Sequence, residues 1–411
     1  MQNHYKEEVV MQVPTDAITR VLGIQGFHVA GLTVLESSVQ VRIESDRPEH
    51  VCPRCGQTLL FAYDVSDRTV RDLPMCGREV ELTFPQYRVL CPCSGRVVTE
   101  HLDFVEPYQH QTRRLQESIY WWLRTGTTTS KVAKAFGLSW VQIRHIDARM
   151  IRQEQKRQSW VGLRRIGVDE KAVGKGHDYI TIISDLDKRR VVFVADGRKR
   201  SSLNRFYRRI GKTRAAELEV VTMDMWKPYI QSTKKYAPQA DIVFDKFHIL
   251  RHLNEKIDQL RRELQKKLEK ESRQVVKRSR WVLLKASENL TDRQRQTLVQ
   301  IAQNNQPLYQ AYLLKEQFRI LLQPADVPTA LDRLAGWFSE VYASGLTPLI
   351  RFVQQCGRWF EGVANYFKHG ATNAFSEAIN GRIALMIRLA NGFRDREYLK
   401  LKIYQQCRDL R

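Results

Sequence analysis

Three short apolar runs between residues 165 and 198 constrain the fold of this chain more than any other stretch. Each has the length of a strand and is rich in β-branched or aromatic residues, and the three are Ile166–Val168, Tyr179–Ile183 and Val191–Val194. The segments between them, GKGHD at Gly174–Asp178 and DLDKRR at Asp185–Arg190, are typical of hairpin connections. We therefore expect three consecutive antiparallel strands in one sheet.

Carboxylates stand at the ends of several predicted strands. Asp169 follows the first run, Asp224 ends the strand Val220–Met223, and Asp245 ends the strand DIVF. The order strand, strand, strand, helix, strand, helix, strand is typical of a ribonuclease-H-like fold, in which the first and fourth strands are neighbours. Asp169 and Asp224 would then lie side by side, and two adjacent carboxylates repel each other unless a cation lies between them, which favours magnesium. The alternative for a single Asp is an ordinary turn residue at a strand end.

Length and charge bound the class of protein. A chain of 411 residues is too long for one ordinary core and predicts two to four domains. The net charge of +22 favours a polyanionic partner, above all nucleic acid, because neutralised phosphates release counterions. No apolar run approaches the roughly 20 residues that a membrane-spanning helix needs. The N-terminus MQNHYKEEVV lacks the apolar core of a signal peptide, so we expect a cytoplasmic protein with reduced cysteines.

A zinc ribbon is predicted where the cysteines gather, since five of the seven fall between Cys52 and Cys93. Cys52 and Cys55 form a CPxCG knuckle, which binds zinc from a tight turn. Cys91 and Cys93 of LCPCSG are the candidates for the second pair, although one intervening residue is fewer than the usual two, and Cys76 is a reserve ligand. We expect one structural zinc; the alternative is a set of unrelated buried cysteines.

A helix-turn-helix is predicted after residue 108, where the apolar period changes from two to about 3.6. An amphipathic helix at Arg113–Arg124 precedes TSKVAKAFGLSWVQIRHIDARM, in which Ala133, Gly137 and Ile143 suit the helix crossing, the turn and the core. The exposed face of the second helix would then present donors and stacking groups to DNA from Trp140, Gln142, Arg144 and His145. A plain helical hairpin is the alternative.

The chain from 251 to about 360 is predicted to be almost wholly helical. Residues 251–300 contain neither Pro nor Gly, and we expect a coiled coil or helical hairpin that interrupts the catalytic fold. After this block, Asn373, Glu377 and Asn380 are spaced i, i+4 and i+7, so one helical face would carry a carboxylate between two amides. A solvated surface helix is the alternative for this face.

Several motifs of the chain resemble those of a known protein family. IGVDE with KGHDY, VTMDMW with PYI, IVFDKFH, and TNAFSEAIN followed by NGFR resemble the motif series of DDE transposases from bacterial insertion sequences, and most closely the insertion-sequence family L-three, from Val51 to the C-terminus. The resemblance implies that Asp169, Asp224 and Glu377 form the catalytic triad, and that Asp245 and His248 match a D-x-x-H signature. The family's usual glycines beside the last motif are replaced by Ala374 and Ala378.

The predicted fold class is a multidomain α+β chain with a zinc ribbon, an all-α helix-turn-helix domain, and a ribonuclease-H-like core interrupted by a helical insertion. The expected parts are an N-terminal hairpin region at 1–47, the ribbon at 48–105, the helix-turn-helix domain at 106–160, the first part of the core at 161–250, the insertion at 251–360 and the rest of the core at 361–411.

The predicted function is that of a transposase, which binds the terminal inverted repeats of its element, cuts there and joins the freed 3′ ends to target DNA. Two Mg²⁺ or Mn²⁺ ions would lie on the triad, with support from Asp245, His248, Asn373 and Asn380. We expect a homodimer assembled on double-stranded DNA, at the nucleoid of a bacterium and away from membranes. The alternatives are a non-enzymatic DNA-binding regulator derived from a transposase, and a structure-specific nuclease.

Overall fold

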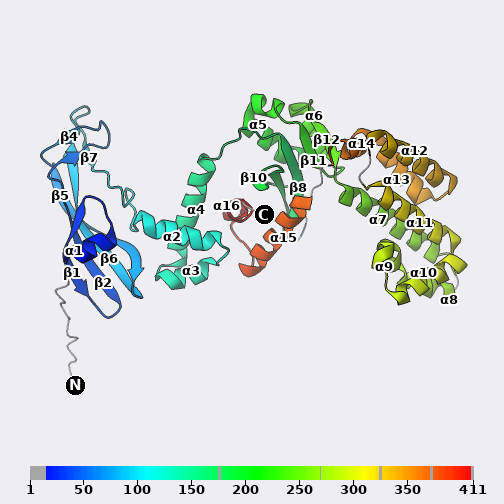
Figure 1. Cartoon of the computed structure of the whole chain (residues 1–411), viewed down its shortest axis with the longest axis horizontal. Coiled ribbons are helices and arrows are strands. Elements are labelled where there is room, and N and C mark those ends of the chain that lie inside the picture. The colour runs from blue at the N-terminus through cyan, green and yellow to red at the C-terminus, as the bar shows by residue number, and fades with distance from the viewer. Residues whose placement is uncertain are drawn as a thin grey trace, which may run out of the picture. The chain divides into compact units, whose positions relative to one another are not determined.

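The computed structural model of the chain divides into two compact units, with the boundary after Arg157 (Figure 1). It describes residues 15–408 apart from 175, 177, 269, 324, 325 and 371–373. Each unit is described by itself.

The N-terminal unit begins with a β-sheet that joins two segments predicted separately. Its elements are α1 (Thr15–Leu22), β1 (Phe27–Val34), β2 (Ser38–Ser45), β5 (Asp64–Met75), β6 (Arg78–Leu90) and β7 (Val97–Thr99), in the strand order β1-β2-β6-β5 with β7 also on β6. The small strands β3 (His50–Val51) and β4 (Thr58–Leu59) pair with each other. Because β2 pairs with β6, strands from residues 1–47 and from 48–105 share one core that includes Val41, Ile43, Leu82 and Phe84.

Three helices complete this unit, and they agree with the predicted helix-turn-helix. They are α2 (Arg113–Arg124), α3 (Thr129–Phe136) and α4 (Trp140–Lys156). Gly137 ends α3 in the left-handed region at φ +62°, which favours glycine, and Ser139 caps α4 through a reciprocal pair of bonds with Gln142. The core between the helices includes Ile119, Val132, Ile143 and Ile146.

The C-terminal unit is built on a mixed sheet. The strands are β8 (Arg165–Gly174), β9 (Asp178–Asp185), β10 (Arg190–Asp196), β11 (Val220–Met223) and β12 (Asp241–Phe244), in the order β10-β9-β8-β11-β12. The first three strands are antiparallel neighbours, as predicted, and β11 is parallel to both β8 and β12. The first and fourth strands of the unit are thus adjacent.

Helices cover both faces of this sheet. On one face α5 (Arg200–Ala216) and α6 (Lys227–Tyr236) bury Leu203, Phe206 and Ile230 against Val168 and Ile183. On the other, α15 (Ala374–Leu389) and α16 (Arg396–Gln406) bury their apolar residues against Ile180, Ile182, Val191 and Val194. The sheet is therefore the middle layer of three.

Helices also fill the chain between β12 and α15. They are α7 (Lys246–Gln265), α8 (Lys270–Arg278), α9 (Arg280–Leu284), a 3₁₀ turn (Ser287–Asn289), α10 (Asp292–Asn304), α11 (Gln306–Leu321), α12 (Val327–Ala343), α13 (Thr347–Arg358) and α14 (Phe360–His369). They form a bundle of short helices instead of the long coiled coil or hairpin expected, because α11, α12 and α13 each restart at a proline in the first turn.

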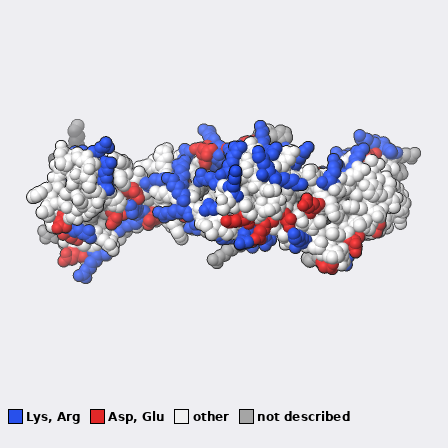
Figure 2. Space-filling model, turned by 90° about the horizontal axis from the view of Figure 1, so that it is seen from above, with Lys and Arg blue, Asp and Glu red and all other residues white. Residues whose placement is uncertain are grey.

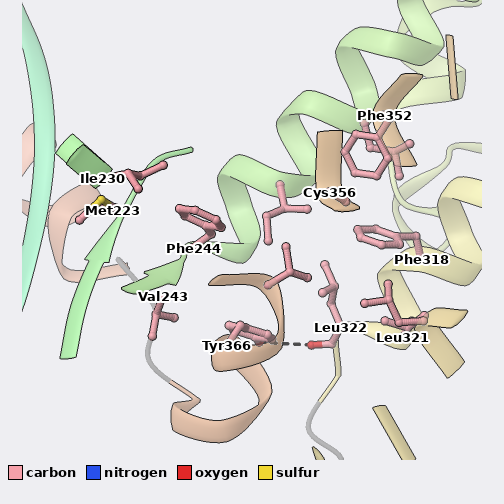
Figure 3. Packing of buried hydrophobic residues seen from close by; sticks show 14 of the residues in the cluster. Met223, Ile230, Val243, Phe244, Phe318, Leu321, Leu322, Phe352, Cys356 and Tyr366 are labelled. Atoms are coloured by element: carbon pink, nitrogen blue, oxygen red, sulfur yellow. Dashed lines mark hydrogen bonds between the residues drawn. The ribbon is translucent and has the colours of Figure 1, made fainter. Parts of the chain in front are cut away.

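The bundle is continuous with the core of the sheet. Phe244 of β12 and Cys356 of α13 belong to one buried cluster, and Tyr366 donates a hydrogen bond of 3.2 Å to the carbonyl of Leu322 (Figure 3). A Cβ added at Gly362 would lie 2.4 Å from the ring of Phe244, so only glycine lets α14 approach β12 this closely. In the part of the chain described, no helix is long and apolar enough to cross a membrane.

Candidate active site and metal centre

Three aspartates converge where β8, β11 and β12 run side by side. Asp169 lies within β8 and is 9% exposed, Asp224 follows β11, and Asp245 follows β12 and caps α7 by accepting a bond of 3.1 Å from the amide of Phe247. The carboxyl ends of parallel strands meet at one edge of a sheet, which is where binding sites of such sheets form. The side-by-side position predicted for Asp169 and Asp224 is therefore present.

His248 contacts Asp224 from the first turn of α7. Its Nδ1 lies 2.7 Å from Oδ1 of Asp224, and the two side chains form an ion pair when the ring is protonated. Burial opposes protonation of the ring, but Asp224, Asp245 and Asp169 together outweigh it and raise the pKa of His248. A positive charge at this position would balance Asp224.

Asp169 is held by hydrogen bonds at both oxygens. Asn380 of α15 donates from Nδ2 to Oδ2 over 2.7 Å, and the backbone amide of Glu170 donates to Oδ1 over 2.7 Å. Burial, followed by the negative charge of Asp224, nevertheless raises the pKa of Asp169 to about 6. Two fixed, neighbouring carboxylates in a partly desolvated edge are a set of hard oxygen ligands suited to a divalent cation.

The remaining residues predicted for this site are less closely grouped. Glu377 lies on α15 one turn before Asn380, so the two share a helical face, and its side chain is exposed. Among the described residues, a cluster of cysteines is the only group of three or more His, Cys, Asp or Glu residues whose ligand atoms lie within 4.8 Å of one another. Glu377, Asp169 and Asp224 do not form such a group. Asn373 lies outside the described residues.

Sequence reasoning missed an aromatic and cationic cluster beside the acids. The guanidinium of Arg198 lies 4.3 Å from the ring centre of Tyr179 and 5.2 Å from that of Trp226, and it pairs with Glu170 at 3.1 Å. Trp226 is 38% exposed. Glu170 follows Asp169, and Trp226 comes two residues after Asp224, so the signal available in the sequence was the position of these residues beside the acids.

A cysteine cluster lies in the N-terminal unit. The sulfur atoms of Cys52, Cys55 and Cys91 lie within 4.8 Å of one another, and Cys55 and Cys91 approach to 3.9 Å. Cys93 is exposed and stands outside this group. Cys76 lies in the β5–β6 turn, at the opposite end of the 13-residue strand β6 from Cys91, and is too distant to be a reserve ligand.

The three thiols fit a zinc ion better than a disulfide framework, because all are free and converge on one point. The Ser94 side chain beside the Cys91 thiol is the largest influence on it, and the pKa of Cys91 is lowered to about 6. Thiolate is the form that binds metal.

The exposed face of α4 carries the residues predicted to contact DNA. Trp140, Gln142 and His145 are exposed, while Arg144 is half-buried with its guanidinium 5.6 Å from the ring centre of Trp140. The side-chain oxygen of Gln142 accepts bonds from the amide and hydroxyl of Ser139, so it caps the helix in this structure and leaves the amide nitrogen as the donor of that side chain.

A basic surface covers the outside of α5 in the C-terminal unit. Residues 197–216 include no Asp or Glu, and Arg205, Arg208 and Arg209 are exposed at i, i+3 and i+4 spacing, followed by Lys212 after a kink at Gly211. Lys and Arg side chains gather over this part of the unit (Figure 2). Such a surface suits the phosphates of DNA.

Models of three domain families match the chain along most of its length. A transposase domain matches residues 166–403, the helix-turn-helix domain of transposase family ISL3 matches 100–150, and the zinc-finger of transposase IS204/IS1001/IS1096/IS1165 matches 48–93. The first covers the acids and the helical bundle, and the other two cover the candidate DNA-reading helix and the cysteine cluster.

Whole proteins are similar as well. The chain is 30% identical over 356 residues to the transposase for insertion sequence element IS1001 of Bordetella parapertussis, covering 86% of this chain and 87% of that protein. It is 27% identical over 376 residues to the transposase for insertion sequence element IS1557 of Mycobacterium tuberculosis, covering 85% and 83% of the two chains.

Proposed function

Because this chain belongs to the ISL3 transposases, the L-three family of insertion sequences, we propose that Asp169, Asp224 and Glu377 cut DNA at the element's terminal inverted repeats and join the 3′ ends to target DNA. The chain is a DDE transposase, an enzyme that cleaves and transfers DNA strands. The observation that carries the assignment of residues is the pairing of Asp169 and Asp224 at one edge of the sheet, with the pKa of Asp169 raised.

The three acids would hold two Mg²⁺ or Mn²⁺ ions. When bound, such ions activate a water or a 3′-hydroxyl and stabilise the leaving oxygen. Asn380 would fix the orientation of Asp169, and Asp245 would fix the start of α7, from which His248 reaches Asp224. Glu377 would turn inward from α15 to complete the set, and Asn373 would support it.

We also propose that the sheet and its helices are a ribonuclease-H-like core, at 161–250 and 361–411, with the bundle at 251–360 as an insertion. The strand order β10-β9-β8-β11-β12 supports this, as does the position of α15, which returns after the bundle to contact Asp169. In the N-terminal part, the proposed domains are the zinc ribbon at 48–105 and the helix-turn-helix domain at 106–160. The predicted hairpin region at 1–47 is joined to the sheet of the proposed ribbon through the pairing of β2 with β6.

DNA recognition would be divided among several surfaces. Trp140, Gln142, Arg144 and His145 on α4 would read the inverted repeats, the basic surface of α5 would hold phosphates, and Trp226 with Arg198 would contact the strand near the acids. A homodimer on DNA would bring two ends together for one joining event. The substrate would be the DNA of a bacterial nucleoid.

The test uses the purified protein, a labelled duplex carrying the element's end, and a target plasmid in Mg²⁺. We expect a nick at the element's boundary and joined products in the plasmid, both abolished by a chelator. Binding without any cleavage would favour the regulator, and cleavage of unrelated branched DNA without joining would favour the structure-specific nuclease.

A further inference from the structure

The cysteine cluster is built from two copies of one turn. The first is CPRCGQ at residues 52–57, and the second is CPCSGR at residues 91–96. In the first, the amide of Cys52 donates to the carbonyl of Gln57 and the amide of Gly56 donates to the carbonyl of Cys52, both over 2.9 Å. In the second, Cys91 donates to Arg96 and Gly95 donates to Cys91, again over 2.9 Å.

The two turns also agree in backbone conformation and burial. Gly56 and Gly95 both lie in the left-handed region, at φ +74° and +62°. In each turn the first cysteine is buried, the next two residues are exposed, the fourth is half-buried and the glycine is exposed. The first turn is followed by β4 and the second by β7. Residues 52–57 therefore correspond one by one to residues 91–96.

This correspondence shows which side chain of the second turn takes the place of each side chain of the first turn. Cys91 occupies the position of Cys52, and Ser94 occupies the position of Cys55. Cys93 corresponds to Arg54, and both of these side chains are exposed. The Oγ of Ser94 is buried and lies beside the thiol of Cys91.

We propose that zinc is held by the thiolates of Cys52, Cys55 and Cys91, and that the hydroxyl of Ser94, not the thiolate of Cys93, faces its fourth coordination position. The proposal rests on the zinc ribbon of the proposed function and changes the ligand set predicted from the sequence. Three thiolates on Zn²⁺ leave a net charge of −1, whereas four give −2. A neutral hydroxyl is a poorer ligand than a thiolate, so the site binds zinc less tightly than a four-cysteine ribbon does.

Three variants of the full chain separate the roles of the residues. Cys93→Ser removes the predicted ligand, Ser94→Cys supplies a thiol at the position that matches Cys55, and Cys55→Ser is the matched loss of a thiolate. Zinc per chain is measured by elemental analysis, and affinity by competition with a chelator. Cobalt is then substituted for zinc, because the intensity of the sulfur-to-cobalt charge-transfer absorption rises with the number of bound thiolates.

We expect Cys93→Ser to retain one zinc with affinity within about twofold of the parent, and Ser94→Cys to bind at least about tenfold more tightly, while Cys55→Ser binds at least about tenfold more weakly. The intensity of the sulfur-to-cobalt absorption should be unchanged in Cys93→Ser. It should rise by the contribution of one thiolate in Ser94→Cys and fall by the same amount in Cys55→Ser. In the zinc-loaded parent, an alkylating reagent should modify Cys93 and Cys76 and spare the three ligands.

The inference is overturned if Cys93→Ser loses zinc, or loses the cobalt absorption that one thiolate contributes, and Ser94→Cys shows no gain in zinc affinity. Protection of Cys93 from alkylation by zinc would have the same meaning. Absence of zinc from the parent is a different outcome, since it removes the ribbon's metal altogether and with it this part of the proposed function. Cleavage of DNA does not enter any of these measurements.

Discussion

His248 and Asn380 give the two paired aspartates different neighbours. Asp224 faces an imidazole at 2.7 Å, whereas Asp169 accepts a hydrogen bond from a neutral amide. The imidazole offers a cation in place of a metal, and the amide holds its carboxylate in one orientation without changing its charge. We therefore expect the environment of Asp224 to change more than that of Asp169 when the proposed divalent ion binds.

We predict that His248→Ala lowers cleavage of the element's end by roughly 10- to 100-fold, the usual effect of removing a group that orients a metal ligand. Binding to the end should be unchanged, because α4 lies in the other unit. Cleavage, gel shift and thermal melting are measured on the same preparation, with His252→Ala, one turn further along α7, as the control. Loss of melting temperature and activity together would mark His248 as an ordinary core residue.

Some residues of the site follow from the sequence and others do not. Asp169 and Asp224 could be paired because each follows an apolar strand and the strand order makes those strands adjacent. Glu377 could be placed on a helical face by its spacing, but the rotation of α15 against the sheet depends on Phe375 and Ile379, which the spacing does not reveal. Cys93 was predicted as a ligand by counting thiols, whereas matching CPRCGQ with CPCSGR aligns Ser94 with Cys55 and leads to the ligand set proposed above.

At the scale of elements, α4 combines a buried, fixed face with an exposed face that we propose to read DNA. Ile143 and Ile146 are buried against α2 and α3, and the capping box at Ser139 fixes the first turn. Trp140 and Arg144 are one turn apart and stack on each other, so the guanidinium is held in place before DNA arrives. This arrangement would lower the entropy lost on the proposed binding of Arg144 to a base or a phosphate.

Arg144→Ala should weaken binding to the element's end by roughly 1 to 3 kcal/mol if the guanidinium reads a base. Titrations on the end and on unrelated duplex at one salt concentration make the measurement, with Arg152→Ala, exposed two turns later on α4, as the control. An equal loss on both duplexes would assign Arg144 to a phosphate, and no loss on either would remove this face of α4 from the interface.

The basic surface of α5 should bind DNA without regard to sequence. Replacing Arg205, Arg208 and Arg209 by Gln should make target binding less dependent on salt. The slope of the logarithm of the binding constant against the logarithm of the salt concentration should become shallower by about 0.9 for each phosphate that the surface no longer neutralises. Joining into the plasmid should fall while the first nick at the element's end persists. The control removes the same charge from the bundle, at Lys266, Lys267 and Lys277; an equal effect there would mean that only net charge matters.

The elements themselves differ in how far the sequence predicts them. The three hairpin strands and the turn at Gly137 were predicted from local patterns, since alternation and a left-handed glycine act within a few residues. The bundle was predicted to be helical but not to be many short helices, because the prolines at α11, α12 and α13 start helices as readily as they end them. The pairing of β2 with β6 joins distant residues and has no local signal.

At the scale of the whole molecule, the proposed reading of the element's ends and the proposed chemistry belong to different units. The candidate reading helix and the cysteine cluster lie before the boundary at Arg157, and the acids lie after it. A change at the acids should therefore alter cleavage without altering recognition, provided that the fold survives. Asp224→Asn is the sharpest such change, because it keeps the size and shape of the side chain and removes its charge.

We predict that the Asp224→Asn protein binds the element's end as the parent does and does not cut it. Loss of the charge leaves Asp169 as the only carboxylate of the pair, so Mg²⁺ is no longer held between them. Non-specific binding should rise slightly, since one source of repulsion toward phosphate is gone. Gel shift and strand cleavage are read from the same samples, in Mg²⁺ and in Mn²⁺.

Asp187→Asn is the matched control for this variant, because it removes one charge from the exposed turn after β9, where Asp187 pairs with Arg165 at the start of β8. It should cut at the parental rate. Cleavage near that rate by Asp224→Asn would show that Asp224 is not a metal ligand. Loss of binding by Asp224→Asn together with a lowered melting temperature would instead assign Asp224 to the fold, because a residue that acts only on the metal changes neither.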